Sequence, residues 1–236
     1  MLFNKKKRLK LLMALMLCAA LSSKAQRNLP SYDYKLLHYG FTVGFSSTNF
    51  KLNHDPSFFA NDSLASIICK PQAGFNLGVL ADLHLGDHFD IRFIPSLHFA
   101  QRNIEFTFIH HAGDTLKSVA KIESTYGEFP LVFKYKSDRI KNTRFYVVGG
   151  FIYSFDFTSN KSVSRKPGDA FVAVVPSNIG YQIGLGFDFY FPYFKFSPEL
   201  KLTNGINNVL VKDGSLYSNT ISGLFSKILQ FNFYIE

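Results

Sequence analysis

The side chains in this sequence that are suited to chemistry are acids, bases and histidines spaced along segments of alternating hydrophobic residues. They are Asp82, His84, Asp90, Arg92, Glu128, Lys134, Asp156, Asp188, Lys195, Glu199 and Lys201. Paired carboxylates, or a carboxylate beside a histidine, can move protons to and from a substrate. The same groups buried together form ion pairs that stabilise a structure. We interpret them as a salt-bridged interior, with a catalytic site at Asp82, His84 or Asp90 as the enzyme alternative.

No other motif indicates a reaction. The sequence has no serine nucleophile elbow, zinc-binding helix motif or phosphate-binding glycine loop. His110 and His111 are adjacent but lack a third ligand in sequence, so metal binding there is a weak hypothesis. Cys69 has no histidine near it and is interpreted as an incidental thiol. We therefore predict a protein that is not an enzyme, with no catalytic, cofactor-binding or metal-binding residues.

The hairpin at residues 129–157 gives the clearest structural signal. In its second arm, Phe145, Val147, Phe151, Tyr153 and Phe155 alternate with polar or glycine positions. Side chains of a strand alternate between its two faces, so one face is aromatic and the other is polar. This arm runs for about thirteen residues, whereas ordinary strands have about five or six. Its length and pattern match a tilted strand that crosses a bilayer.

Six further segments alternate in the same way. They are residues 39–50, 74–85, from 89 onward, 179–190, 194–203 and 229–235. Because an open sheet edge is not tolerated in hydrocarbon, membrane-spanning strands must close into a ring. With the two arms of the hairpin, the sequence predicts an all-β fold, an eight-stranded antiparallel transmembrane up-and-down β-barrel. Lys227 falls on the outward side, so we expect it near a membrane interface.

The connections alternate between short and long. Short turns are expected at 86–88, 137–143 and 191–193, and long loops at 51–73, 106–125, 158–178 and 205–218. This alternation is typical of outer-membrane barrels, which have tight periplasmic turns and longer external loops. A soluble lipocalin-like barrel is the alternative, but it would turn its hydrophobic face inward around a ligand. Glycine and charged residues on the face opposite the aromatic one favour the membrane barrel, because they predict a polar interior.

The N-terminus has the layout of a cleavable export signal. A basic stretch precedes an apolar core at 11–21, followed by Ser23-Lys24-Ala25 as a cleavage site. The core is too short for a retained helical anchor, and Leu17 before Cys18 disfavours lipid attachment. We predict a cleaved signal peptide at 1–25, a periplasmic lead-in at 26–38 and an outer-membrane β-barrel at 39–236.

Removal of the signal also changes the charge. The whole chain has 26 basic and 17 acidic residues, and the signal holds six of the basic ones and no acid. The mature chain therefore has 20 basic against 17 acidic residues, with no lysine or arginine stripe. This balance gives no support to a nucleic-acid partner.

Several stretches resemble one family. Residues 128–131 (EFPL), 136–142 (KSDRIKN) and 145–150 (FYVVGG) look like the central hairpin of the PorT family, outer-membrane barrels of the Bacteroidetes type IX secretion and gliding machinery. Residues 186–199, 205–210, 217–219 and 224–229 are similar to its later strands. One departure is Glu236 at the end of the chain, where outer-membrane barrels usually carry an aromatic residue.

The resemblance implies a non-enzymatic accessory of protein secretion, needed to export proteases and adhesins and for gliding motility. Its expected partners are outer-membrane lipids and other type IX secretion components, and no catalytic residue is carried over. A small structural or adhesive outer-membrane barrel of the OmpX or OmpA type, without a secretion role, is the alternative. A narrow pore is a further possibility.

Overall fold

The computed structural model describes residues 28–59, 64–109, 114–159 and 172–236. The predicted signal peptide (1–25) and the pair His110 and His111 lie outside these residues. The elements are η1 (Tyr32–Tyr34), β1 (Leu37–His54), α2 (Pro56–Phe59), β2 (Leu64–Lys70), β3 (Gln72–His84), β4 (Phe89–Phe93), β5 (Ser96–Ile109), β6 (Thr115–Lys136), β7 (Thr143–Asp156), β8 (Ser177–Tyr190), β9 (Lys195–Gly205), α3 (Leu216–Asn219) and β10 (Ile221–Ile235). Among the described helices, none has the length and apolar character needed to cross a membrane.

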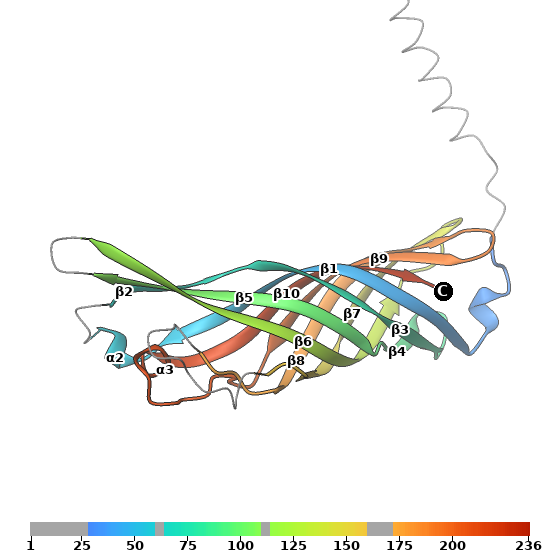
Figure 1. Ribbon diagram of the computed structural model, residues 1–236. Coiled ribbons are helices and arrows are strands. Elements are labelled where there is room, and N and C mark those ends of the chain that lie inside the picture. Colours follow the sequence, from blue (N-terminus) through green and yellow to red (C-terminus); the bar gives the residue numbers. More distant parts are fainter. Residues whose placement is uncertain (1–27, 60–63, 110–113, 160–171) are drawn as a thin grey trace, which may run out of the picture.

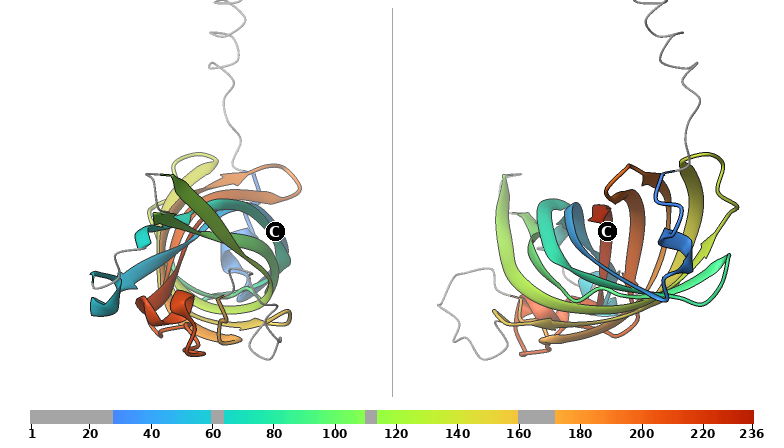
Figure 2. Two further views of the ribbon diagram at one scale, coloured as in Figure 1. Left: turned by 60° about the vertical axis from the view of Figure 1, so that its left-hand side comes forward. Right: turned by 90° about the vertical axis from the view of Figure 1, so that its right-hand side faces the viewer.

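The strands form one antiparallel sheet that closes on itself. Neighbours follow the order β1-β10-β9-β8-β7-β6-β4-β3-β5-β2, and β1 also pairs with β3. The closing seam runs from Leu37 opposite Leu83 to Thr48 opposite Gln72. Figure 2 shows the strands encircling an interior. The predicted all-β antiparallel barrel is confirmed.

The strand count is ten, where the sequence analysis predicted eight. Pro71 separates β2 from β3, and Ile94-Pro95 separates β4 from β5. Proline has no backbone N–H and interrupts a strand ladder. Both halves of each pair nevertheless run in one direction, because β2 and β3 both pair antiparallel with β5, and β4 and β5 both pair antiparallel with β6. The chain therefore passes along the barrel eight times, in ten strands.

Two of the predicted long loops were wrong in extent. Strand β1 continues to His54, and β5 and β6 remain paired out to Ile109 opposite Thr115. These strands project beyond the rest of the barrel at what we call the extended end, on the left of Figure 1. The opposite, short-turn end carries the tight connections 85–88, 137–142 and 191–194, as predicted. The strand extensions were missed because their sequences lack the alternation of aromatic and polar residues that marks the lipid-facing parts of the same strands.

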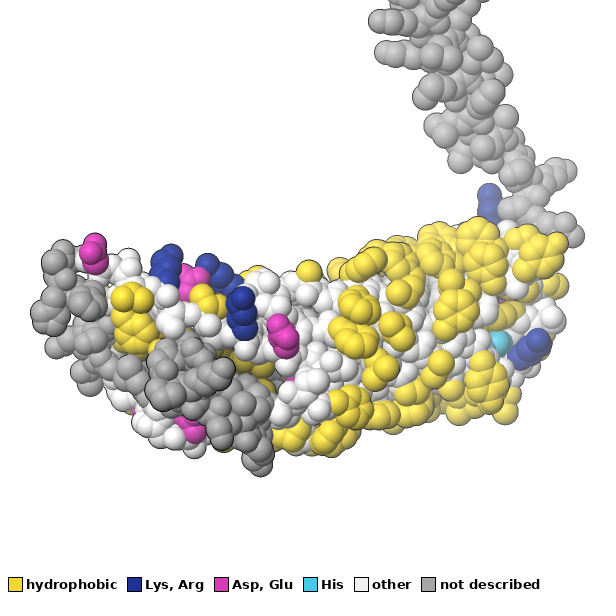
Figure 3. Space-filling model, viewed as in Figure 1, with side chains coloured by type: hydrophobic (Ala, Val, Ile, Leu, Met, Phe, Trp, Pro, Cys, Tyr) yellow, Lys and Arg dark blue, Asp and Glu magenta, His cyan; other side chains and the backbone are white. Residues whose placement is uncertain are grey.

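A hydrophobic band covers the outer surface. Tyr39, Phe41, Val43 and Phe45 of β1 are 45–70% exposed, while Thr42 between them is 3% exposed. Figure 3 shows such side chains gathered over the part of the barrel near the short-turn end, with charged side chains toward the extended end. This arrangement is the one required of a wall that faces lipid.

Glycines on the inward face make room for large interior side chains. A Cβ atom on Gly186 would lie 2.5 Å from the hydroxyl oxygen of Tyr146, which is fully buried in the interior. The glycine-rich minority face seen in the sequence therefore reflects a filled interior.

Candidate functional site

Arg92 of β4 lies at the centre of the interior near the short-turn end. Its guanidinium contacts three carboxylates, with N–O distances of 3.0 Å to Asp82, 3.2 Å to Glu199 and 3.4 Å to Glu236. The ring of Tyr146 lies 5.1 Å from its Cζ atom. The planar, permanently charged guanidinium is suited to several acceptors at once.

The final residue of the chain is part of this cluster. The Glu236 carboxylate lies 2.9 Å from Lys195 Nζ and accepts a hydrogen bond of 2.7 Å from the Tyr32 hydroxyl. Burial raises the pKa of Tyr32 well above its ordinary value, so the phenol stays protonated and donates. Glu236 thus holds the lead-in against the barrel.

The lead-in crosses the mouth of the short-turn end. Tyr32 stacks on His38 with ring centroids 3.9 Å apart. Arg139, in the turn between β6 and β7, lies 3.6 Å from Asp33 and 3.7 Å from the centroid of the Tyr190 ring. These contacts close the mouth, a feature that the sequence analysis did not predict for the lead-in.

Two further ion pairs lie beside Arg92. Lys134 Nζ donates to both oxygens of Asp188, at 2.9 and 2.7 Å, and the Ser197 hydroxyl donates to Asp188 at 2.6 Å. Lys136 and His84 share Asp90, at 2.5 and 2.8 Å. All these groups are buried or largely so, and each carboxylate has a cationic or hydrogen-bonding partner, as buried charges require.

Farther along the interior the polar contacts continue. His98 lies 2.8 Å from Glu128, and its other ring nitrogen lies 2.7 Å from the Ser46 hydroxyl. Arg102 donates to the Tyr126 and Ser226 hydroxyls.

The predicted salt-bridged interior is therefore confirmed for the predicted set, with one exception. Asp156 is buried, accepts a hydrogen bond of 3.0 Å from the Thr158 hydroxyl and pairs with no cation of the described residues. Sequence reasoning left other members of the interior network out of this set. They include Tyr32, His98, Arg102, Lys136 and Glu236. Lys136 lies two residues after Lys134, and Arg102 lies four residues after His98. Alternation along a strand therefore places both on the inward face, and the sequence alone could have identified them.

A hydrophobic cluster fills the interior at the extended end. Its buried members are Phe50, Leu64, Ile67, Ile104, Phe106, Ala120, Ile122, Val172, Val174, Val209, Leu210, Ile221 and Leu224. Many come from segments predicted as loops, which is why the sequence analysis did not anticipate this core. Over the described residues, the barrel is thus packed with charge pairs at one end and with apolar side chains at the other.

The interior leaves little room for a substrate. The cavity beside Asp82, His84 and Asp90 has a volume of about 10 Å³, room for about one water molecule. Among the described residues, no group of three or more His, Cys, Asp or Glu side chains is placed to bind a metal ion. Burial raises the pKa of Cys69, on β2 beyond the hydrophobic band, to about 11, which keeps it a poor nucleophile.

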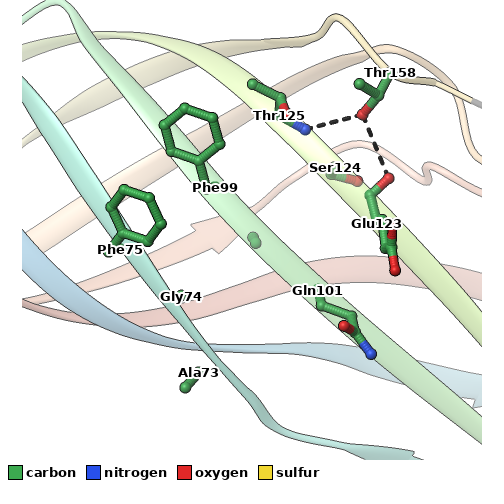
Figure 4. Close-up of a pocket in the computed structure, with 10 residues that line it drawn as sticks. Ala73, Gly74, Phe75, Phe99, Gln101, Glu123, Ser124, Thr125 and Thr158 are labelled. Atoms are coloured by element: carbon green, nitrogen blue, oxygen red, sulfur yellow. Dashed lines mark hydrogen bonds between the residues drawn. The ribbon is translucent and has the colours of Figure 1, made fainter.

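The outer surface carries a cleft of about 510 Å³ over β3, β5 and β6. Paired residues end at Phe75 opposite Phe99 and resume at Lys70 opposite Asn103, with Pro71 between them. The two phenylalanine rings stack with centroids 4.8 Å apart. Figure 4 shows them beside one another, with Thr158 bonded across to the strand that carries Glu123 and Thr125. The cleft lies where the hydrophobic band meets polar side chains.

A second groove, of about 300 Å³, lies at the short-turn end. Its lining residues come from the lead-in, two turns and the start of β7: Pro30, Asp33, Tyr34, Asp87, His88, Asp138, Arg139 and Arg144. Tyr34 is 89% exposed, and Ile140 in the same turn as Arg139 is 74% exposed.

Comparisons with known proteins agree with this architecture. A family model described as outer membrane protein beta-barrel domain matches residues 24–211. A search of curated proteins finds no match.

Solved structures similar to the chain include three small barrels. The Pseudomonas aeruginosa outer membrane protein OprG is 14% identical, with a TM-score of 0.43. The match covers 84% of this chain and 91% of the OprG chain. Neisserial surface protein A is 10% identical, with a TM-score of 0.42 and coverages of 85% and 99%. Outer membrane protein AlkL is 11% identical, with a TM-score of 0.40 and coverages of 89% and 96%. The assignment to a family rests on the domain match.

Proposed function

Because the chain belongs to the outer membrane protein beta-barrel domain family, we propose that it is a non-enzymatic outer-membrane barrel that supports type IX protein secretion. The outer membrane is its location, and lipid is the environment of its hydrophobic band. In the proposed orientation, the short-turn end faces the periplasm and the extended end faces outward, as in barrels with short periplasmic turns.

The observation that carries this proposal is the filled interior. Tyr32 closes one mouth, Arg92 and its partners occupy the middle, and the apolar cluster around Ile104 fills the other end. A barrel of this kind offers no wide channel, and its acids and bases already have partners. It acts on other molecules through its two ends and its outer wall.

The likeness to the PorT family points to the short-turn end. The residues that carry it at 136–142 become the turn between β6 and β7, which binds the lead-in and lines the groove of about 300 Å³. Ile140 and Tyr34 project from this surface into solvent. We propose that another secretion component docks here.

Complementation of a deletion strain tests the proposal. We expect the deletion to leave cargo proteins in the periplasm and abolish surface motility, and the wild-type gene to restore both. Ile140→Ser combined with Tyr34→Ser should fail to restore export, although both side chains are exposed and their loss should not unfold the barrel. The matched control is Ile109→Ser, 52% exposed at the extended end, which should restore export. Normal export in the deletion strain would refute the proposal.

A structural or adhesive role is the second candidate. The paired extension of β5 and β6 out to Ile109 presents a surface beyond the hydrophobic band, as an adhesive barrel would need. Replacing residues 103–121 with a short turn should then reduce attachment to cells or surfaces and leave export intact. Loss of export with unchanged attachment would favour the secretion role.

A further inference from the structure

A third groove lies on the outer wall, over β1, β8, β9 and β10. It lies at the border of the hydrophobic band that is nearer the extended end. It has a volume of about 370 Å³. Its lining residues are Lys51, Asn53, Tyr181, Asn204, Gly205, Ile206, Phe225 and Ser226, none of which is acidic.

Lys51 lines this groove, and a second lysine, Lys227, lies at its edge, next to Ser226 on β10. Lys51 of β1 lies opposite Phe225, and Lys227 of β10 lies opposite Asn49 on one side and Asn204 on the other. Both lysines are exposed on the outward face as diagonal neighbours on adjacent strands, which places the two residues about 7–8 Å apart, with their Cβ atoms somewhat closer. Neither ammonium group forms an ion pair or hydrogen bond with another residue of the described chain. Like charges so placed repel each other unless an anion lies between them.

Apolar side chains lie directly beside Lys227, toward the short-turn end. Leu229 follows Lys227 on the same face of β10, and it lies opposite Leu202 on β9. Both leucines are part of the lipid-facing wall. A ligand at the lysines would therefore have its remaining part in contact with hydrocarbon, while Asn53 and Asn204 offer amide donors at the level of the charge.

We propose that this groove binds the phosphorylated headgroup of a membrane lipid, with Lys51 and Lys227 on the phosphate and the acyl chains along Leu229 and Leu202. Charge-assisted contacts of lysine to phosphate are among the stronger hydrogen bonds in proteins. In the orientation proposed above, the lipid belongs to the outer leaflet. The site concerns the lipid around the barrel and does not depend on a secretion partner.

Two other lysines toward the extended end, Lys70 and Lys117, do not offer such a site. Lys117 lies 3.3 Å from Glu105, and Lys70 pairs with the same carboxylate. Their charges are compensated within the protein. Lys117 is therefore a control that removes an exposed positive charge of the same kind from the same end of the barrel.

The test measures the midpoint of thermal unfolding of the mature barrel in a neutral detergent, by heat-dependent gel mobility, during titration with lipid A. Binding to the folded state raises the midpoint as the lipid concentration rises. We expect a concentration-dependent rise for wild type and for Lys117→Gln. Lys51→Gln with Lys227→Gln should need at least about tenfold more lipid for the same rise, because both phosphate contacts are lost.

Single variants and other probes separate the outcomes. Lys51→Gln and Lys227→Gln alone should give intermediate affinities, and they replace the double variant if it fails to fold. Phosphatidylcholine should give no comparable rise, and the rise with lipid A should shrink at high salt. The proposal is overturned by equal affinity of wild type and the lysine variants, by an equal rise with phosphatidylcholine, or by an equal rise with inorganic phosphate alone.

Discussion

The ion pair between Lys134 and Asp188 gives the sharpest test of the packed interior. Lys134 Nζ lies 2.9 and 2.7 Å from the two carboxylate oxygens, and neither side chain is more than 1% exposed. Lys134→Met keeps the length of the side chain and removes its charge. Asp188 then stays buried with the Ser197 hydroxyl, 2.6 Å away, as its remaining hydrogen-bond donor.

The expected cost follows from burial. Removing one partner of a buried ion pair destabilises a protein by about 3–5 kcal/mol, because the other charge stays desolvated and uncompensated. Replacing both partners with apolar residues avoids that penalty, so Lys134→Met with Asp188→Leu should be more stable than the single variant. The buried Ser197 hydroxyl, left without its acceptor, costs about 1–3 kcal/mol, so the double variant should lie within about 3 kcal/mol of wild type.

Urea unfolding of the barrel in lipid vesicles measures these free energies. The chain has no tryptophan, so circular dichroism and gel mobility report the folded state. Lys212→Met is the control, because Lys212 is exposed and pairs with Asp55 at 3.4 Å at the surface. This substitution should change the free energy of unfolding little. The reasoning is refuted if Lys134→Met is as stable as the control, or if the double variant is less stable than Lys134→Met alone.

Three further predictions address other parts of the molecule. Ile104→Ala, at a fully buried position of the apolar cluster, should cost about 2–5 kcal/mol and speed protease cleavage at the extended end; unchanged cleavage would contradict the packing described. Tyr32→Phe removes a hydrogen bond to the Glu236 carboxylate that is worth about 1.5–3 kcal/mol. Backbone amide hydrogen exchange should therefore be faster in the lead-in of this variant. Equal exchange rates in the variant and wild type would show that other contacts hold the lead-in. The rate of Cys69 alkylation should still be rising at pH 10, because burial raises the thiol pKa to about 11; a plateau near pH 9 would contradict this.

Much of the barrel wall could be predicted from the sequence, because a strand that faces lipid on one side must alternate. The outward side chains of β7, such as Phe151 and Tyr153, carry that signal without ambiguity. The same alternation also identified most of the interior charges, because residues such as Lys134 and Asp188 fall on the inward face of their strands. Their partners could not be assigned, because pairing across the barrel depends on register and tilt.

The ends of the barrel were harder to predict, for a physical reason. Beyond the membrane, a strand may face water outside and an apolar core inside, so β5 near Ile104 and Phe106 loses the aromatic outward face. A short lead-in without alternation gives no sign that Tyr32 will reach Glu236, about two hundred residues away in sequence. The export signal and the type IX role stay predictions.

Electrical recording tests the central claim most directly. The purified barrel, folded into a planar bilayer under an applied voltage, should carry no steady current, because paired charges around Arg92 and the apolar cluster around Ile104 fill its interior. A steady, ohmic conductance from the intact wild-type protein would contradict the account, since ions would then cross an interior that these side chains are expected to close.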